Sequence, residues 1–162
     1  MKIREYDQDS DFAQLRDCVI ELQDFERQID ARLPAGQDIA EEYITQMRFR
    51  CRSCDGQILV ADLDGDVVGY VTLLNRVQSD ELHEGETEYG LVADLVIKEA
   101  HRGTGLGRKL MQAAEAAATA YGVRWLRVSV MSANTSARNL YLSSGFSELY
   151  AEFEKDLGNE AN

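Results

Sequence analysis

The chain has little of what marks several classes of protein. No apolar run approaches the ~18 residues that a membrane-spanning helix needs, so no segment is expected to cross a bilayer. The first residues, Met1 to Tyr6, have the pattern of a short strand and lack the apolar core of a signal peptide, so we expect no export. Three cysteines, an odd number, do not form a disulfide framework, and a reducing cytoplasm is the simpler expectation.

Positive charge is also scarce. The chain has 17 Lys and Arg against 29 Asp and Glu, for a formal net charge of −12. General nucleic-acid binding needs a basic surface, which this balance excludes. An acidic surface would concentrate cationic ligands such as amines, although solubility alone also explains such a charge.

A metal centre has little support in the sequence. Cys51 and Cys54 form a single CxxC pair, and the two histidines, His83 and His101, are remote from it. Because zinc needs about four ligands and no second pair follows, we expect no metal.

The chain does have the length and composition of one globular domain. It contains 162 residues, of which 44% are hydrophobic and 28% charged. There is one proline and no repeat, low-complexity tract or linker. We therefore expect one domain over residues 1–157, followed by a polar tail at 158–162.

Hydrophobic periodicity predicts an α/β fold with a mixed, mostly antiparallel central sheet flanked by helices. Residues 23–38 are expected to form a loop or short helix, and 78–86 an exposed connection. The predicted strands are 3–6, 57–63, 67–74, 88–97, 123–131 and 146–157, and the predicted helices are 9–22, 39–51, 105–121 and 135–144.

The most informative stretch is a strand followed by glycines and a helix. Leu91–Ile97 is apolar and β-branched with a single charge, which is typical of a strand buried on both faces. A helical spacing begins at Leu106, and Gly103, Gly105 and Gly107 precede or open it. Glycine permits positive φ and close approach to the main chain, and a helix start offers unpaired N–H groups and partial positive charge. The stretch therefore predicts a cradle for an anion, most simply a phosphate or pyrophosphate.

Two common nucleotide motifs do not fit this stretch. A P-loop requires GxxxxGK followed by Ser or Thr, whereas Lys109 is followed by Leu110 and the glycine spacing differs. A dinucleotide fingerprint requires GxGxxG, whereas the glycines here give GxGxG after a strand in the middle of the chain.

Two segments together resemble the GNAT acyltransferase superfamily. Arg102-x-x-Gly105-x-Gly107 after an apolar strand is similar to its acetyl-CoA loop, (Q/R)xxGx(G/A). The segment 134–146 is similar to the second half of its signature, N-x-x-A-x-x-x-Y-x-x-x-G-F. The two occur in the family's order with a predicted strand between them, which makes the resemblance specific over residues 94–146.

The resemblance implies the GNAT fold and transfer of an acetyl group from acetyl-CoA to an amine acceptor by direct attack, without a covalent enzyme intermediate. The loop would hold the pyrophosphate through its N–H groups, the preceding strand would pair with the pantetheine arm, and Asn134 would contact that arm. The cofactor-binding residues implied are Leu95, Val96, Ile97, Arg102, Gly103, Thr104, Gly105, Leu106, Gly107, Arg108 and Asn134.

Tyr141 matches the family tyrosine that protonates the sulfur of CoA. Its phenol, with a reference pKa of about 10, is an uncharged proton donor at neutral pH, although a core position on its helix is the alternative. The general base is open. Ser129 stands where N-terminal acetyltransferases of ribosomal proteins carry a glutamate, and it cannot serve. Asp94 and Glu88 on the central strand are the candidates, with a water relay as the alternative.

The sequence therefore predicts an N-acetyltransferase that acts on a primary amine of a small, cationic molecule or of an amino acid-like compound. The alternatives are an acetyltransferase for a protein N-terminus or lysine, with a peptide between residues 23–38 and the terminal strand, and a CoA-binding module without catalysis. The resemblance also allows a homodimer, although no stretch announces an interface.

Overall fold

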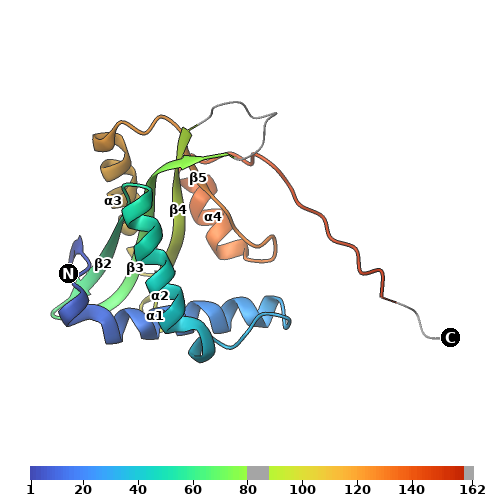
Figure 1. Ribbon diagram of the computed structural model, residues 1–162, viewed down its shortest axis with the longest axis horizontal. Helices are drawn as coiled ribbons and strands as arrows, with labels where there is room; N and C mark the ends of the chain where they lie inside the picture. The colour runs from blue at the N-terminus through green and yellow to red at the C-terminus, as the bar shows by residue number, and fades with distance from the viewer. Residues whose placement is uncertain (80–87, 159–162) are drawn as a thin grey trace.

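The computed structural model describes residues 1–79 and 88–158, and within these ranges a five-stranded sheet carries helices on both faces (Figure 1). The strands lie in the order β1-β2-β3-β4-β5; β1 to β4 are antiparallel neighbours, and β4 and β5 are parallel. This confirms the expected α/β class and mixed, mostly antiparallel sheet. The strands are β1 Lys2–Glu5, β2 Gln57–Leu63, β3 Asp66–Gln78, β4 Glu88–Ile97 and β5 Leu126–Val128; the helices are α1 Gln8–Ile29, α2 Gly36–Ser53, α3 Leu106–Tyr121 and α4 Thr135–Ser143, with a 3₁₀ turn at Glu99–His101.

The core lies in two layers, one on each face of the sheet. On one face α1 and α2 bury Leu15 and Ile44 against Tyr70 of β3. On the other face α3 buries Leu110 against Val71 of β3 and Val92 of β4. The central strands are therefore packed on both faces, as their apolar sequence predicts.

The two N-terminal helices are longer than predicted. α1 continues past residue 22 to Ile29, and α2 begins at Gly36, so the loop expected over 23–38 shrinks to the few residues between them. The helix persists because Leu22 and Phe25 are partly buried, and no Gly or Pro interrupts the chain before Pro34. The longer α1 places its C-terminal turns beside the site described below.

The terminal strand predicted over 146–157 is wrong. After Phe146, which packs against Tyr141, residues 147–158 run as exposed extended chain that leads away from the sheet (Figure 1, red). This segment is held by side-chain contacts rather than by backbone pairing with the sheet. Arg138 forms an ion pair with Glu148, and Arg32 forms one with Glu154. The strand predicted over 123–131 is reduced to the three residues of β5. Alternating apolar residues therefore do not make a strand where no sheet edge accepts them.

Two of the segments expected from the sequence lie partly outside the described residues. The connection expected over 78–86 starts at the last residue of β3, and its residues from 80 lie outside the described part of the chain. The polar tail at 158–162 is likewise outside it apart from Gly158. Among the described helices, none combines the length and apolarity needed to cross a bilayer.

A bulge in β4 decides which way its side chains face. Thr72 of β3 pairs with Asp94 and the next residue, Leu73, pairs with Val92, so Ala93 has no partner across the pair. Ala93 and Asp94 consequently both face α2, while Val92 packs on the α3 side. The bulge thus turns a carboxylate into the α2 side of the sheet.

A buried ion pair fastens the first strand to the first helix. Arg4 of β1 donates to both carboxylate oxygens of Asp11 in the first turn of α1, at 2.5 and 2.9 Å, and to Asp62 of β2 at 2.7 Å. Asp11 is only 2% exposed. The Arg4 guanidinium lowers the pKa of Asp11 to about 2, so this carboxylate stays ionised in the folded protein across the ordinary pH range.

We expect Arg4→Gln to destabilise the fold by about 3 kcal/mol at neutral pH, because it leaves the buried charge of Asp11 without its cation. The folded pKa of Asp11 lies below its unfolded value, so its stabilisation is present above about pH 4 and is lost as the pH falls toward about 2. Urea denaturation at several pH values measures both effects. The matched control is Arg52→Gln on the exposed side of α2, and equal stability of the two variants would contradict the prediction.

Candidate active site

The glycine loop between β4 and α3 has the geometry of an anion cradle. Gly103 and Gly105 have φ of 75° and 84°, in the left-handed region, and Gly105 is the N-cap of α3. The first backbone bond of the helix is donated by Lys109 to the Gly105 carbonyl, at 3.2 Å. In the described part of the chain, no backbone bond is donated by the N–H groups of residues 103–108. These donors are therefore available to an anion at the helix start.

The side chains of the loop pack against the protein and stabilise the conformation of the loop. Leu106 is buried in the α3 core, and Gly107 faces Leu140 of α4, where an added Cβ would meet the Leu140 side chain at 3.2 Å. The hydroxyl of Thr104 donates to the His101 carbonyl at 2.7 Å. The loop is thus closed on its inner side, while a Cβ on Gly103 or Gly105 would meet nothing within 4 Å.

The two arginines of the loop have partners within the protein. Arg102 donates to the Ile97 carbonyl and to Glu21 of α1, both at 2.9 Å, and its guanidinium lies over the Phe25 ring. Arg108 donates to the Ser143 hydroxyl of α4 at 3.0 Å. Both side chains tie the loop to neighbouring helices, so the free donors of the cradle are the backbone N–H groups.

We expect Gly105→Ala to weaken acetyl-CoA binding by about 10-fold or more, because alanine disfavours the left-handed backbone on which the cradle depends. Gly65→Ala, in the turn between β2 and β3, is a close match, because Gly65 also has positive φ and open space around it. Calorimetric titration should show weakened binding in Gly105→Ala alone, while thermal denaturation shows similar losses in both. Equal affinity in the two variants would contradict the assignment.

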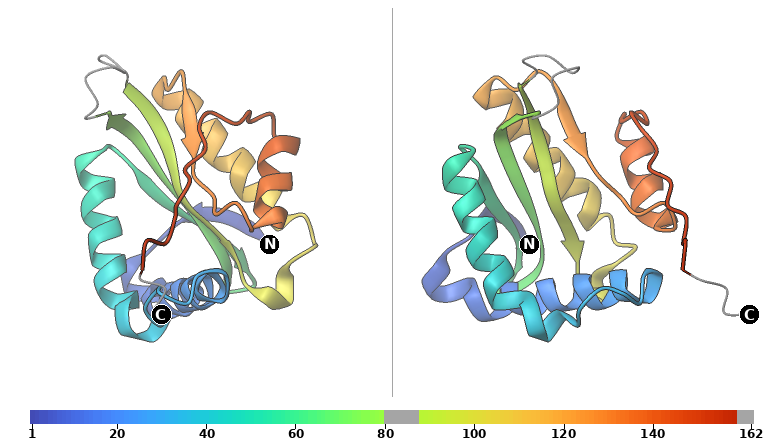
Figure 2. Two further views of the ribbon diagram at one scale, coloured as in Figure 1. Left: turned by 90° about the vertical axis from the view of Figure 1, so that its right-hand side faces the viewer. Right: turned by 45° about the vertical axis from the view of Figure 1, so that its right-hand side comes forward.

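The strand before the loop has an unpaired edge. β5 pairs only with Gly90–Val92, and beyond it the chain turns away from β4 toward α4 (Figure 2). Leu95, Val96 and Ile97 pair with β3 on the opposite edge. Main-chain groups of these residues that face the β5 side can pair with an extended ligand as a strand would.

Asn134, the other residue expected to contact the pantetheine arm, caps α4: its side-chain oxygen accepts a hydrogen bond from the Ala137 N–H at 3.1 Å.

Tyr141 lies on α4 with its ring packed against Phe146, at 6.0 Å between ring centroids, and is 8% exposed. Burial, followed by the negative charges of Asp94 and Glu26, raises the pKa of Tyr141 to about 12. The phenol therefore remains protonated at neutral pH, as a proton donor must.

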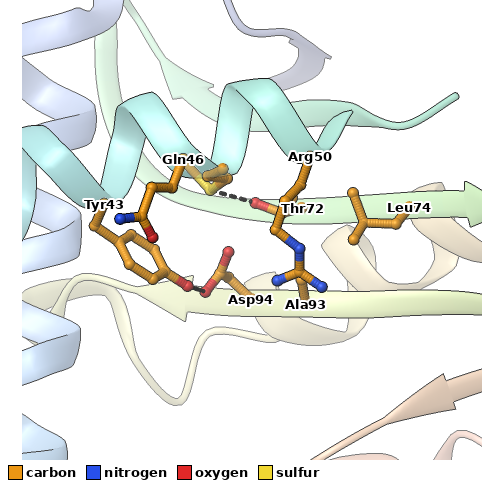
Figure 3. A pocket seen from close by; sticks show the side chains of 8 residues that line it. Tyr43, Gln46, Arg50, Thr72, Leu74, Ala93 and Asp94 are labelled. Atoms are coloured by element: carbon orange, nitrogen blue, oxygen red, sulfur yellow. Dashed lines mark hydrogen bonds between the residues drawn. The ribbon is translucent and has the colours of Figure 1, made fainter. Parts of the chain in front are cut away.

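Asp94 is 6% exposed and accepts a hydrogen bond from the hydroxyl of Tyr43 on α2 (Figure 3). Within the described residues its other oxygen, Oδ2, has no hydrogen-bond partner, and the Thr72 hydroxyl opposite it donates instead to the Met47 sulfur at 2.8 Å. Burial raises the pKa of Asp94 above its ordinary value, against the opposing effects of the Tyr43 hydroxyl, the nearby Thr72 hydroxyl and the charge of Arg50. The site thus holds a buried carboxylate with one free acceptor oxygen.

Glu88 is placed elsewhere. It is the first residue of β4, six residues from Asp94, which corresponds to about 20 Å along a strand. Its carboxylate is paired with Arg76 at 3.3 Å. The structure therefore brings Asp94, and not Glu88, near Tyr141.

Several residues of this site carry no recognisable signal in the sequence. Glu26 of α1 is half-buried, and burial and then the charge of Asp94 raise its pKa. Tyr43 of α2 and Tyr70 of β3 also lie in the field of Asp94, and burial raises the pKa of each well above 10. These residues come from three elements far apart in the chain, and no local motif marks them.

The structure thus brings together a glycine loop at a helix start, an open strand edge and a protonated tyrosine beside carboxylates. A sequence model of the acetyltransferase (GNAT) family matches residues 19–146, and the chain belongs to this family. The match confirms the family that the two sequence segments resemble.

The chain is also similar to individual proteins. It is 34% identical to the N-alpha-acetyltransferase daf-31 of Caenorhabditis elegans over 84 residues. This aligned stretch covers 51% of this chain and 43% of that protein. It is 36% identical over 81 residues to the N-terminal acetyltransferase A complex catalytic subunit NAA10 of Arabidopsis thaliana, and this stretch covers 49% of this chain and 39% of that protein. The aligned part is thus less than half the length of either relative. A solved tetramutant of the BH1408 protein of Bacillus halodurans has the same fold, with a TM-score of 0.82 at 18% identity over 97% of this chain and 100% of that one.

Proposed function

We propose that the protein transfers an acetyl group from acetyl-CoA to a primary amine of a small molecule that is cationic at that amine. The observation that carries the proposal is the pair of carboxylates, Asp94 and Glu26: the charge of Asp94 raises the pKa of Glu26, and both charges raise the pKa of Tyr141. No cation is among the groups that shift the pKa of Glu26. The ammonium group of an acceptor would supply the missing positive charge.

In this proposal the backbone N–H groups of residues 103–108 bind the pyrophosphate, and the open edge of β4 binds the pantetheine arm. The side-chain amide nitrogen of Asn134, which its capping role leaves unused, is a further donor for that arm. The chain's task is then to hold the thioester and the amine in contact and to move two protons.

The proton steps are assigned to two side chains. Asp94 accepts a proton from the ammonium, and burial, which raises the pKa of its carboxyl, makes it a stronger base than an exposed aspartate. The neutral amine attacks the thioester carbonyl, and as the tetrahedral intermediate collapses the C–S bond breaks, the thiolate of CoA leaves and the nitrogen loses its second proton to solvent. Tyr141 gives its phenolic proton to that thiolate and is reprotonated from solvent. The products are the acetylated amine and CoA.

A second acceptor class is favoured by the relatives. Both curated relatives are named as N-alpha- or N-terminal acetyltransferases, so the free amine of a protein N-terminus is the second candidate. A peptide ammonium carries the same charge as that of a small amine, so the carboxylate pair fits it equally well.

The test begins with calorimetric titration of acetyl-CoA into the purified protein. CoA release is then followed with a panel of small amines and, separately, with a panel of peptides that differ in their first residues, and mass spectrometry identifies the products. Faster turnover of small amines supports the first candidate and faster turnover of peptides the second. Binding of acetyl-CoA without turnover of either panel would overturn both in favour of a non-catalytic CoA-binding module.

We also propose a reducing, cytoplasmic setting. It is supported by Cys18, Cys51 and Cys54, all of which are free thiols. Labelling of the thiols in protein taken from cells under denaturing conditions tests this, because prior oxidation would block the label.

A further inference from the structure

A small pocket separates α2 from the sheet at the β4 bulge (Figure 3). Its volume is about 50 Å³, which is room for a few water-sized groups rather than for a whole sugar or polyamine. Side chains of α2 form one wall, and side chains of β3 and β4 form the other. The lining residues are Tyr43, Gln46, Met47, Arg50, Thr72, Leu74, Ala93 and Asp94.

The pocket carries one unpaired acceptor on its sheet wall. Asp94 is more than nine-tenths buried, and its Oδ2 has no hydrogen-bond partner in the described part of the chain. A carboxylate oxygen can only accept hydrogen bonds, and leaving it unpaired in a buried site is costly. A ligand that donates an N–H to this oxygen would therefore supply the hydrogen bond that the buried carboxylate lacks.

The opposite wall carries an unpaired cation. Arg50 of α2 lines the pocket, and among the described residues its guanidinium makes no hydrogen bond and no ion pair within 4.0 Å, with Asp94 or any other group. Its charge nevertheless reaches across the pocket, because Arg50 lowers the pKa of Asp94 against the effect of burial. An acceptor oxygen and a guanidinium thus face one space without pairing.

A third polar group, Gln46, lines the same pocket on the side of Tyr43 (Figure 3). The side-chain nitrogen of Gln46 donates to Glu42 on the same helix at 3.1 Å, which fixes the orientation of the amide. Its carbonyl oxygen has no partner in the described residues and remains free to accept from an ammonium.

We propose that this pocket binds the head group of an acceptor that carries a carboxylate beside its amine, as an α-amino acid does. The ammonium donates to Asp94 Oδ2 and the carboxylate pairs with the Arg50 guanidinium, a geometry that favours two parallel hydrogen bonds. The small volume holds the head group alone, and the rest of the acceptor lies outside. A diamine of the same length places a second cation against Arg50 and is disfavoured. This inference rests on the proposed transfer to an amine and names the class of acceptor.

The test compares matched pairs of acceptors, each an L-amino acid and the amine that remains when its carboxylate is removed. For the wild-type protein we expect KM to be about 10- to 100-fold lower for the amino acid than for its amine. Arg50→Gln should abolish most of this ratio by raising KM for the amino acid, with kcat changed little. Arg50→Lys keeps the charge without the planar fork and should restore part of the ratio. Arg52→Gln, an exposed arginine of the same helix outside the pocket, is the control and should keep the wild-type ratio.

Binding is measured separately from turnover, by the shift in melting temperature that each L-amino acid and each amine produces. Amino acids that bind in an Arg50-dependent manner without being acetylated would support the pocket and overturn the proposed function. Acetylation of amines with no preference for the carboxylate, unchanged by Arg50→Gln, would support the proposed function and overturn the pocket. Absence of both binding and turnover with every amino acid would also overturn the pocket.

Discussion

Replacing Tyr141 by phenylalanine should lower kcat for acetyl transfer by about 100- to 1,000-fold, because on the proposed mechanism the thiolate of CoA would then leave without a positioned proton donor. The ring still packs against Phe146 and stability changes little, since the hydroxyl makes no hydrogen bond in the described part of the chain. Steady-state CoA release, together with a thermal denaturation curve, measures the two effects. Affinity for acetyl-CoA should remain close to that of the wild type.

The pH dependence separates this role from a structural one. Burial raises the pKa of Tyr141 to about 12, so we expect no fall in rate from this group as the pH rises through the range in which the protein is stable. Tyr141→Phe should lower kcat by the same factor at every pH, so that the curve of kcat against pH keeps its shape. Tyr121→Phe, at the exposed end of α3, is the matched control and should be fully active. A Tyr141→Phe enzyme with wild-type kcat would remove the assigned acid.

Replacing Asp94 by asparagine is expected to have opposite effects on activity and stability. The proton acceptor is lost, so kcat falls by about 100-fold or more. Asparagine keeps an oxygen for the Tyr43 hydroxyl but carries no buried charge, so the melting temperature at neutral pH should rise by a few degrees.

The sign of the stability effect follows from the pKa of Asp94, which burial raises above its unfolded value. A group of this kind costs stability once the pH has risen through its folded pKa, and the cost disappears below its unfolded pKa. The difference between Asp94→Asn and wild type should therefore shrink as the pH falls. Glu88→Gln, at the far end of the same strand, tests the other carboxylate. Lost activity there with full activity in Asp94→Asn would transfer the role of base to Glu88.

Much of this protein could be predicted from its sequence, because the signals involved are local. The glycines before α3 are required by the backbone itself, since Gly103 and Gly105 adopt positive φ that other residues rarely adopt. The segment with Asn134 and Tyr141 forms one short helix whose cap and buried face follow from its own spacing. The family, the fold class and the course of most strands rest on such patterns.

Tertiary structure alone decided the side chains around Asp94. Its direction depends on a bulge that leaves Ala93 unpaired, and a shift of one residue in a strand moves side chains to the other face. Tyr43 and Arg50 reach it because α2 packs across that face. No spacing of residues in the sequence predicts these contacts, because they depend on how separate helices and strands pack against one another.

The same reason explains the error at the C-terminus. Residues 146–157 alternate as a strand does, but a strand exists only where another backbone pairs with it, and β5 ends after Val128. The sequence by itself determined the glycine loop, the helix that carries Tyr141 and the family, because each depends on neighbours along the chain. The surroundings of Asp94 and the pocket beside Arg50 were decided by the tertiary structure, because each depends on contacts between residues far apart in that chain.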